Sequence, residues 1–134
     1  MHNLKYFLII VVTLFSVSIF ALDKKAEYYN EDKLGIAVTP NKKEFVIKLK
    51  SNRTTGYSWF LSEFDEEFLE PQAHSYEVTQ AKVAGSPGFQ VWKFKVNEDA
   101  FKVPQQSPLK FVYARPWDGN EQAKEVVFKV SSVF

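Results

Sequence analysis

The sequence predicts an all-β fold, an immunoglobulin-like antiparallel β-sandwich of about seven or eight strands, because three observations agree. Apolar residues alternate with polar ones over several short runs. These runs recur at roughly regular spacing, with polar turns between them. The chain contains no cysteine, so a core of 13 Phe, 6 Tyr and 3 Trp has to stabilise it without disulfides.

The first 21 residues are typical of a secretory signal peptide rather than of the folded domain. Lys5 is followed by an apolar stretch over residues 6–20, and the small residue Ala21 precedes the expected cleavage point. An uncleaved membrane anchor is the alternative, but the apolar stretch is short for a span of about 20 residues. We therefore expect residues 22–134 to form one domain that is secreted to a periplasm, the extracellular space or a vesicular lumen, with no membrane attachment after cleavage.

Seven strands are expected along this domain from the period-two pattern. They cover residues 34–39, 44–50, 57–61, 73–81, 89–96, 109–114 and 125–134. The residues expected to face the core are Phe45, Ile47, Leu49, Tyr57, Trp59, Leu61, Trp92, Phe94, Val96, Leu109, Phe111, Tyr113, Val126, Phe128, Val130 and Phe134. One interruption follows the third run, where Phe64 and Phe68 at i,i+4 spacing predict a short helical turn, with Ser62 as its cap and Pro71 as its stop.

The composition excludes several kinds of partner and site. Once residues 1–21 are removed, acidic and basic residues are equal in number and no basic block occurs, so nucleic acid is not expected as a partner. A chain without cysteine has no thiol nucleophile and no zinc-thiolate site. His74 is the single histidine of the mature chain, and we expect it on the surface of a strand. We therefore expect no catalytic residue, no metal and no cofactor.

Three connections between the expected strands have distinctive sequences. They are N-R-T-T-G-Y at 52–57, G-S-P-G at 85–88 and R-P-W-D-G-N at 115–120. Counted along the chain, they follow the second, fourth and sixth expected strands. Because alternate connections of a sandwich lie at the same end, we expect the three loops to meet at one end of the domain.

The three loops, in this order, resemble those of the chagasin-type inhibitors of papain-like cysteine proteases. That family has N-P-T-T-G-Y in the first loop, a glycine-rich second loop followed by Gln and an aromatic strand, and R-P-W or R-P-F in the third. The resemblance covers essentially the whole mature domain and implies a monomeric protein inhibitor, not an enzyme, whose partner is a papain-like cysteine protease such as papain or a cathepsin L-type enzyme. The residues that it implies contact the protease are Asn52, Arg53, Thr54, Thr55, Gly56, Gly85, Ser86, Pro87, Gly88, Arg115, Pro116 and Trp117.

The resemblance also implies how such loops work. Thr54 and Thr55 would enter the cleft at the catalytic cysteine, and the other two loops would lie on either side of it. Threonine has few rotamers to lose, and Gly56 can adopt the positive φ that a tight apex needs. Arg53 departs from the family, which has proline at this place. Loss of the proline should cost about 0.4–1 kcal/mol of preorganisation, which a contact between Arg53 and the enzyme would offset.

The same residues also have ordinary structural interpretations, and other functions stay open. Thr54 and Thr55 are common turn residues, and Trp117 fits a core position as well as an exposed one. The alternative function is a noninhibitory secreted immunoglobulin-like module that binds a glycan or a cell-surface protein through the same loops. A hydrolase using Asp65 and Glu67 is a third possibility, which is disfavoured because both carboxylates lie in an acidic, solvated stretch without partner groups.

Overall fold

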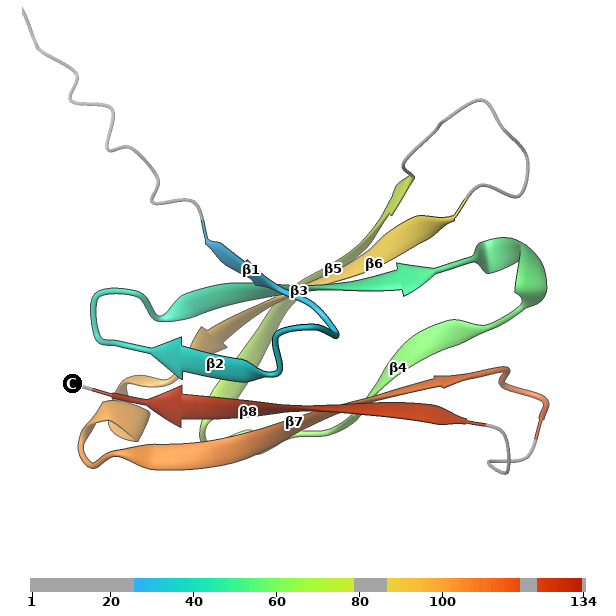
Figure 1. Cartoon of the computed structure of the whole chain (residues 1–134). Helices are drawn as coiled ribbons and strands as arrows, with labels where there is room; N and C mark the ends of the chain where they lie inside the picture. Colours follow the sequence, from blue (N-terminus) through green and yellow to red (C-terminus); the bar gives the residue numbers. More distant parts are fainter. Residues whose placement is uncertain (1–25, 79–86, 119–122, 134) are drawn as a thin grey trace, which may run out of the picture.

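Eight strands, within the residues described, form two four-stranded sheets packed as a β-sandwich (Figure 1). The computed structural model describes residues 26–78, 87–118 and 123–133. The expected signal peptide and residues Gly85, Ser86 and Phe134 lie outside these ranges. The strands are β1 (Glu27–Tyr29), β2 (Gly35–Val38), β3 (Glu44–Ser51), β4 (Ser58–Glu63), β5 (Leu69–Val78), β6 (Gly88–Val96), β7 (Gln105–Ala114) and β8 (Lys124–Ser132), with short 3₁₀ helices η2 (Arg53–Thr55) and η3 (Glu98–Phe101). The predicted all-β sandwich is confirmed.

The pairing is antiparallel in the body of both sheets and parallel at one edge of each. The sheet orders are β1-β3-β6-β5 and β2-β8-β7-β4. The short edge strands β1 and β2 pair in parallel with β3 and β8. The turn after β2 does not close a hairpin, because β2 and β3 belong to different sheets. Strand β1 was missing from the sequence prediction, since three residues with only Tyr29 buried show no alternation.

The core lies between the two sheets and consists largely of the residues that the apolar–polar alternation predicts to face inward. Phe45, Ile47 and Leu49 of β3 are buried, as are the inward residues of β6, β7 and β8. The ring of Phe111 connects the two sheets, with its centroid 4.7 Å from that of Trp92 and 5.9 Å from that of Phe128. The predicted facing of these strands is therefore confirmed. Tyr57, Leu61 and Tyr113 face the same way but are only partly buried, because they lie near strand β4 at the edge of its sheet.

The helical turn expected over residues 62–71 is present only as a single hydrogen-bonded turn at residues 65–69, and its expected cap at Ser62 and stop at Pro71 are wrong. Strand β4 continues through Ser62, and only a single hydrogen-bonded turn follows, in which the N–H groups of Phe68 and Leu69 donate to the carbonyl of Asp65 (3.1 and 2.9 Å). Pro71 does not stop an element but lies inside β5, next to a register shift between Pro71 and Ala73. Proline is tolerated there because β5 is an edge strand, whose outer N–H groups face no partner strand among the described residues. The i,i+4 spacing of the phenylalanines reflects one turn of chain rather than a helix.

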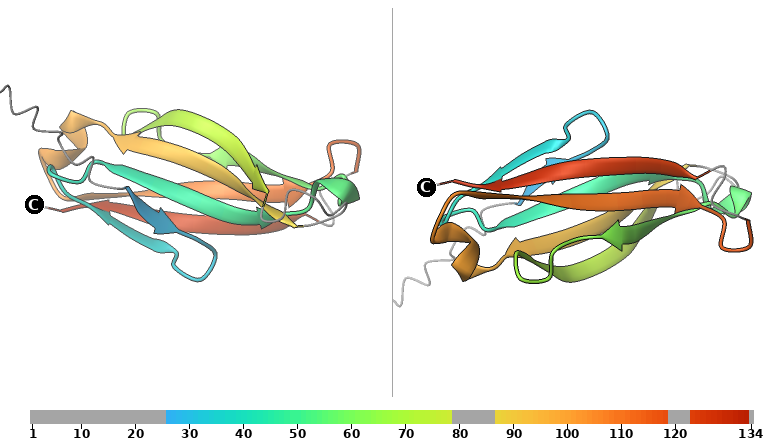
Figure 2. Two further views of the ribbon diagram at one scale, coloured as in Figure 1. Left: turned by 90° about the horizontal axis from the view of Figure 1, so that it is seen from above. Right: turned by 90° about the horizontal axis from the view of Figure 1, so that it is seen from below.

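The described parts of the three loops gather at one end of the sandwich. Figures 1 and 2 show η2 and the chain that leaves β7 at the same end of the molecule. Strand β5 ends and β6 begins at this end too, since Gly88 pairs with Val78 on one side and with Ser51 on the other. The expectation that the loops meet is confirmed for the residues described. We refer to residues 52–57, 87–88 and 115–118 together as the loop end.

Candidate functional site

The first loop is a compact 3₁₀ turn held by its own side chains. Asn52, with extended backbone angles (φ −118°, ψ 105°), caps η2. Its Oδ1 accepts hydrogen bonds from the backbone N–H of Thr54 (3.1 Å) and from the Thr54 hydroxyl (2.6 Å). The Thr55 hydroxyl donates to the Asn52 carbonyl (2.8 Å) and accepts from the Tyr57 N–H (3.3 Å). Both threonines are nevertheless exposed, so they build the turn and also present its apex to solvent.

Gly56 ends this turn in the left-handed conformation that the sequence predicted. Its φ is 79°, and its N–H donates to the carbonyl of Arg53 (3.3 Å). A Cβ added at Gly56 would lie 2.7 Å from Cη2 and 3.0 Å from Cζ2 of Trp117. The indole therefore lies directly against the glycine, and the first and third loops form one continuous surface.

The third loop presents Trp117 and restrains Arg115. Trp117 is 70% exposed, so the core position considered for it is excluded. The guanidinium of Arg115 lies over the ring of Tyr57 at 4.4 Å, and its Nε is 3.4 Å from Oδ2 of Asp118. The N–H of Asp118 donates to the Arg115 carbonyl (3.2 Å) and closes the turn around Pro116. Arg115 is therefore a partly buried, held cation rather than a freely solvated one.

An aromatic base connects both loops to the core. The ring of Tyr113 in β7 stacks on Tyr57 (centroids 5.3 Å apart) and lies 4.9 Å from Trp59, which is buried. The hydroxyl of Tyr113 also accepts a hydrogen bond from the Asn52 N–H (3.4 Å). The Trp59 indole donates through Nε1 to the Lys50 carbonyl (2.8 Å) just before the first loop. Stacked rings anchored on the buried Trp59 restrict the loops that they carry.

Only part of the second loop is described. Pro87 is exposed, whereas Gly88 is buried at the start of β6. A Cβ on Gly88 would lie 2.5 Å from both the Glu77 carbonyl oxygen and the hydroxyl of Tyr76. Because Gly88 has no side chain, the Tyr76 side chain of β5 can lie close to the start of β6.

Tyr76 and Gln90, which lie next to the loop end in β5 and β6, were not predicted as site residues. Tyr76 donates its hydroxyl to the Ser51 carbonyl (3.1 Å). Gln90 is buried and binds both backbone groups of Trp59: its Oε1 accepts from the N–H (2.7 Å) and its Nε2 donates to the carbonyl (3.2 Å). It thereby pairs the free edge of β4 with the opposite sheet, which fixes the strand that follows the first loop.

A cleft of about 280 Å³ lies beside the first loop, lined by Arg53, Ser58, His74, Tyr76 and Gln90, among others. His74 is on the surface of β5, as expected, and its ring stacks on Trp92 with centroids 4.4 Å apart and a 7° angle between planes. Burial, and then the charge of Arg53, lower the pKa of His74. The neutral imidazole is thus the form that this environment favours.

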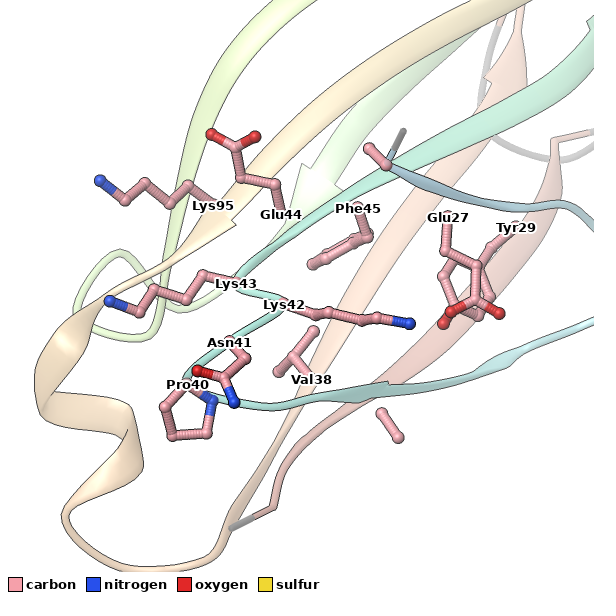
Figure 3. A pocket seen from close by; sticks show the side chains of 12 residues that line it. Glu27, Tyr29, Val38, Pro40, Asn41, Lys42, Lys43, Glu44, Phe45 and Lys95 are labelled. Atoms are coloured by element: carbon pink, nitrogen blue, oxygen red, sulfur yellow. The ribbon is translucent and has the colours of Figure 1, made fainter. Parts of the chain in front are cut away.

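A second cavity, of about 440 Å³, lies at the opposite end of the sandwich (Figure 3). Its lining includes Lys42, Lys43 and Lys95 together with the apolar Val38 and Phe45. Burial, together with a hydrogen bond to Glu27, raises the pKa of the adjacent Tyr29 to about 12. Of the predicted protease-contacting residues that the structure describes, none lines this cavity.

The described ranges provide no candidate for a metal centre or a membrane span. Within them, no three His, Asp or Glu side chains are grouped so that they could bind a metal ion. No helix in the same ranges is long and apolar enough to cross a bilayer.

Comparisons with known proteins identify the family and agree with the fold. The family described as "Chagasin family peptidase inhibitor I42" matches residues 39–131. A cysteine protease inhibitor from Entamoeba histolytica, EhICP2, is similar in structure with a TM-score of 0.67 and 17% identity, over 81% of this chain and 96% of that one. Amebosin is similar with a TM-score of 0.62 and 25% identity, over 81% of this chain and 98% of that one. PbICP-C, solved in complex with falcipain-2, is similar with a TM-score of 0.58 and 14% identity, over 81% of this chain and 91% of that one. Comparison with curated proteins gave no significant match.

Proposed function

The chain belongs to the chagasin family of peptidase inhibitors, and we propose on that premise that it is a secreted, reversible inhibitor of papain-like cysteine proteases. Its targets are enzymes such as papain and cathepsin L-type proteases. It acts as a monomer after removal of residues 1–21, with no catalytic residue or cofactor of its own. PbICP-C, which shares this fold, was solved with falcipain-2 bound, and this supports a protease as the partner.

The observation that carries the proposal is the contact between Trp117 and Gly56. This contact joins the R-P-W loop to the T-T-G apex, so that small polar residues and a large exposed aromatic form one surface. Tryptophan and arginine are enriched among residues that dominate binding energy. A surface whose loops are already held by hydrogen bonds and stacked rings loses little entropy on binding.

In the proposed complex the first loop fills the active-site cleft without being cleaved. Thr54 and Thr55 at the apex lie next to the catalytic cysteine, Arg115, Pro116 and Trp117 contact one side, and residues 85–88 contact the other. Cleavage requires a scissile carbonyl held at attack geometry. The apex is instead a 3₁₀ turn whose hydrogen bonds to Asn52 oppose extension of the chain. The loop therefore occupies the cleft as a poor substrate.

We expect the mature chain, residues 22–134, to inhibit papain and a cathepsin L-type enzyme and to leave trypsin active. Protease–inhibitor interfaces bury about 800 Å² per partner and commonly give nanomolar affinity or better. Trp117→Ala should weaken inhibition by about 30-fold, as for an aromatic anchor worth about 2 kcal/mol. The measurement is a titration of each protease, with electrophoresis to follow cleavage of the inhibitor.

A matched control for Trp117 is Val103, which is also exposed and apolar but lies between η3 and β7, away from the loop end. Val103→Ala should inhibit papain like the unmodified chain. If papain keeps its activity at micromolar concentrations of the chain and digests it steadily, the proposal fails and the noninhibitory binding module becomes the better interpretation.

A further inference from the structure

Arg53 is held by an aromatic ring from a different part of the chain. Its guanidinium carbon lies 3.7 Å from the ring centroid of Tyr76, within the range of a cation–π contact. Arg53 is the first residue of η2, whereas Tyr76 belongs to strand β5. The contact therefore connects the base of the first loop to the sheet that carries the second loop.

Tyr76 is itself fixed on two sides. Its hydroxyl donates to the Ser51 carbonyl (3.1 Å), at the last residue of β3 before the first loop. The missing side chain of Gly88 allows the hydroxyl to approach β6, because a Cβ there would lie 2.5 Å from it. The ring is consequently a rigid platform under Arg53 rather than a mobile surface side chain.

Arg53 occupies a backbone position that favours proline, whose ring fixes φ covalently. Arg53 follows an extended N-cap residue and starts a 3₁₀ helix, which is where proline is favoured because its fixed φ suits the first turn. An arginine at this place has a free φ and needs another restraint. The ring of Tyr76 supplies such a restraint through the side chain.

We propose that Tyr76 is a positioning residue for inhibition: by holding Arg53, it fixes the first turn of η2 and so keeps the T-T-G apex in its binding conformation. The effect on inhibition rests on the proposed function. The effect on the loop does not, because it is a property of the free chain.

The proposal is tested by a cycle of variants at positions 53 and 76. Tyr76→Leu keeps apolar bulk but removes both the aromatic face under Arg53 and the hydroxyl that donates to the Ser51 carbonyl. It should weaken inhibition of papain about fivefold, chiefly through faster dissociation, whereas Tyr76→Phe, which removes the hydroxyl alone, should weaken it less. Arg53→Pro restores rigidity covalently and supplies the background in which the contact with Tyr76 is absent. In the Arg53→Pro background, Tyr76→Leu should then have less than about a twofold effect, since the contact that it removes is no longer needed.

A second readout does not involve a protease. Backbone order parameters of Thr54, Thr55 and Gly56 in the free chain should be near 0.85, as for rigid backbone, and fall toward 0.6 in Tyr76→Leu. They should return to the original value in the doubly substituted chain with Arg53→Pro. Arg53→Gln, at an exposed position, removes the cation and should reproduce the loss if Tyr76→Leu does not fold.

Two outcomes would overturn the inference. The first is an equal loss of order from Tyr76→Leu in the arginine and proline backgrounds, and the second is no loss in either. Absence of papain inhibition by the unmodified chain would instead refute the proposed function, and the order parameters would still decide whether Tyr76 positions the loop.

Discussion

Gly56→Val is expected to weaken inhibition of papain by about a hundredfold, or about 2.7 kcal/mol. Gly56 has a φ of 79°, where a non-glycine residue is strained by about 1–3 kcal/mol, most of all when it is β-branched. The new Cβ would also meet the Trp117 ring at 2.7 Å, and the exposed indole would have to move. Both changes alter the surface that the proposed complex uses. The measurement is the inhibition constant for papain, with urea unfolding to follow stability.

Gly35 provides the matched control for this substitution. It lies in β2, and a Cβ added there meets nothing within 4 Å. Gly35→Val should therefore inhibit like the unmodified chain and change stability by less than about 0.5 kcal/mol. Equal inhibition by Gly56→Val and Gly35→Val would show that the Gly56–Trp117 contact has no part in binding.

Trp59→Ala is expected to destabilise the domain by about 3–5 kcal/mol, because it removes a large buried side chain. Trp59 is 2% exposed, packs against Tyr113 and donates through Nε1 to the Lys50 carbonyl at 2.8 Å. A loss of this size is a large part of the stability of a typical domain, about 5–15 kcal/mol. The free energy of unfolding in urea, followed by circular dichroism, measures it.

The neighbouring Phe60 is the control for Trp59. It is an aromatic residue of the same strand but points to the opposite face and is 43% exposed. Phe60→Ala should cost less than about 1 kcal/mol, since little apolar area returns to water. A cost for Trp59→Ala that is no larger than that for Phe60→Ala would contradict the assignment of Trp59 to the core.

The strands of the sandwich were predictable because burial of one face imposes period two. This pattern located seven strands and the inward residues of β3 and β6. It failed where burial does not alternate. Strand β1 is too short to show a period, and the turn before β5 brings Phe64 and Phe68 inward with helical spacing but without a helix.

The gathering of the loops at one end and their local conformation were predictable, but the contacts that hold them were not. The cap at Asn52 and the positive φ at Gly56 follow from residue type and position within one short loop. The contacts made by Tyr76, Gln90 and Tyr113 depend instead on which strands lie side by side and in what register. Tyr76 pairs with Gln90 across β5 and β6, and neither the pairing nor the gap left by Gly88 can be seen from the spacing of residues in the sequence.

The central claim is that the apex of the first loop lies beside the catalytic cysteine of the protease, and a thiol exchange reaction tests it most directly. The chain has no cysteine, so Thr54→Cys, Thr55→Cys and Asn41→Cys each introduce one thiol, which is converted to a mixed disulfide with thiopyridine. Attack by the active-site thiolate of papain on the sulfur of the introduced cysteine would form the cross-link and release thiopyridone. A disulfide requires Cα atoms within about 7 Å.

We expect the variants at Thr54 or Thr55 to form a one-to-one covalent complex with papain far faster than Asn41→Cys. Asn41 is exposed in the turn between β2 and β3, at the opposite end of the sandwich, and serves as the control for random collision. The rate is followed by thiopyridone absorbance and the product by electrophoresis. Cross-linking from Asn41→Cys that is as fast as from both apex variants, while these still inhibit papain, would contradict the account.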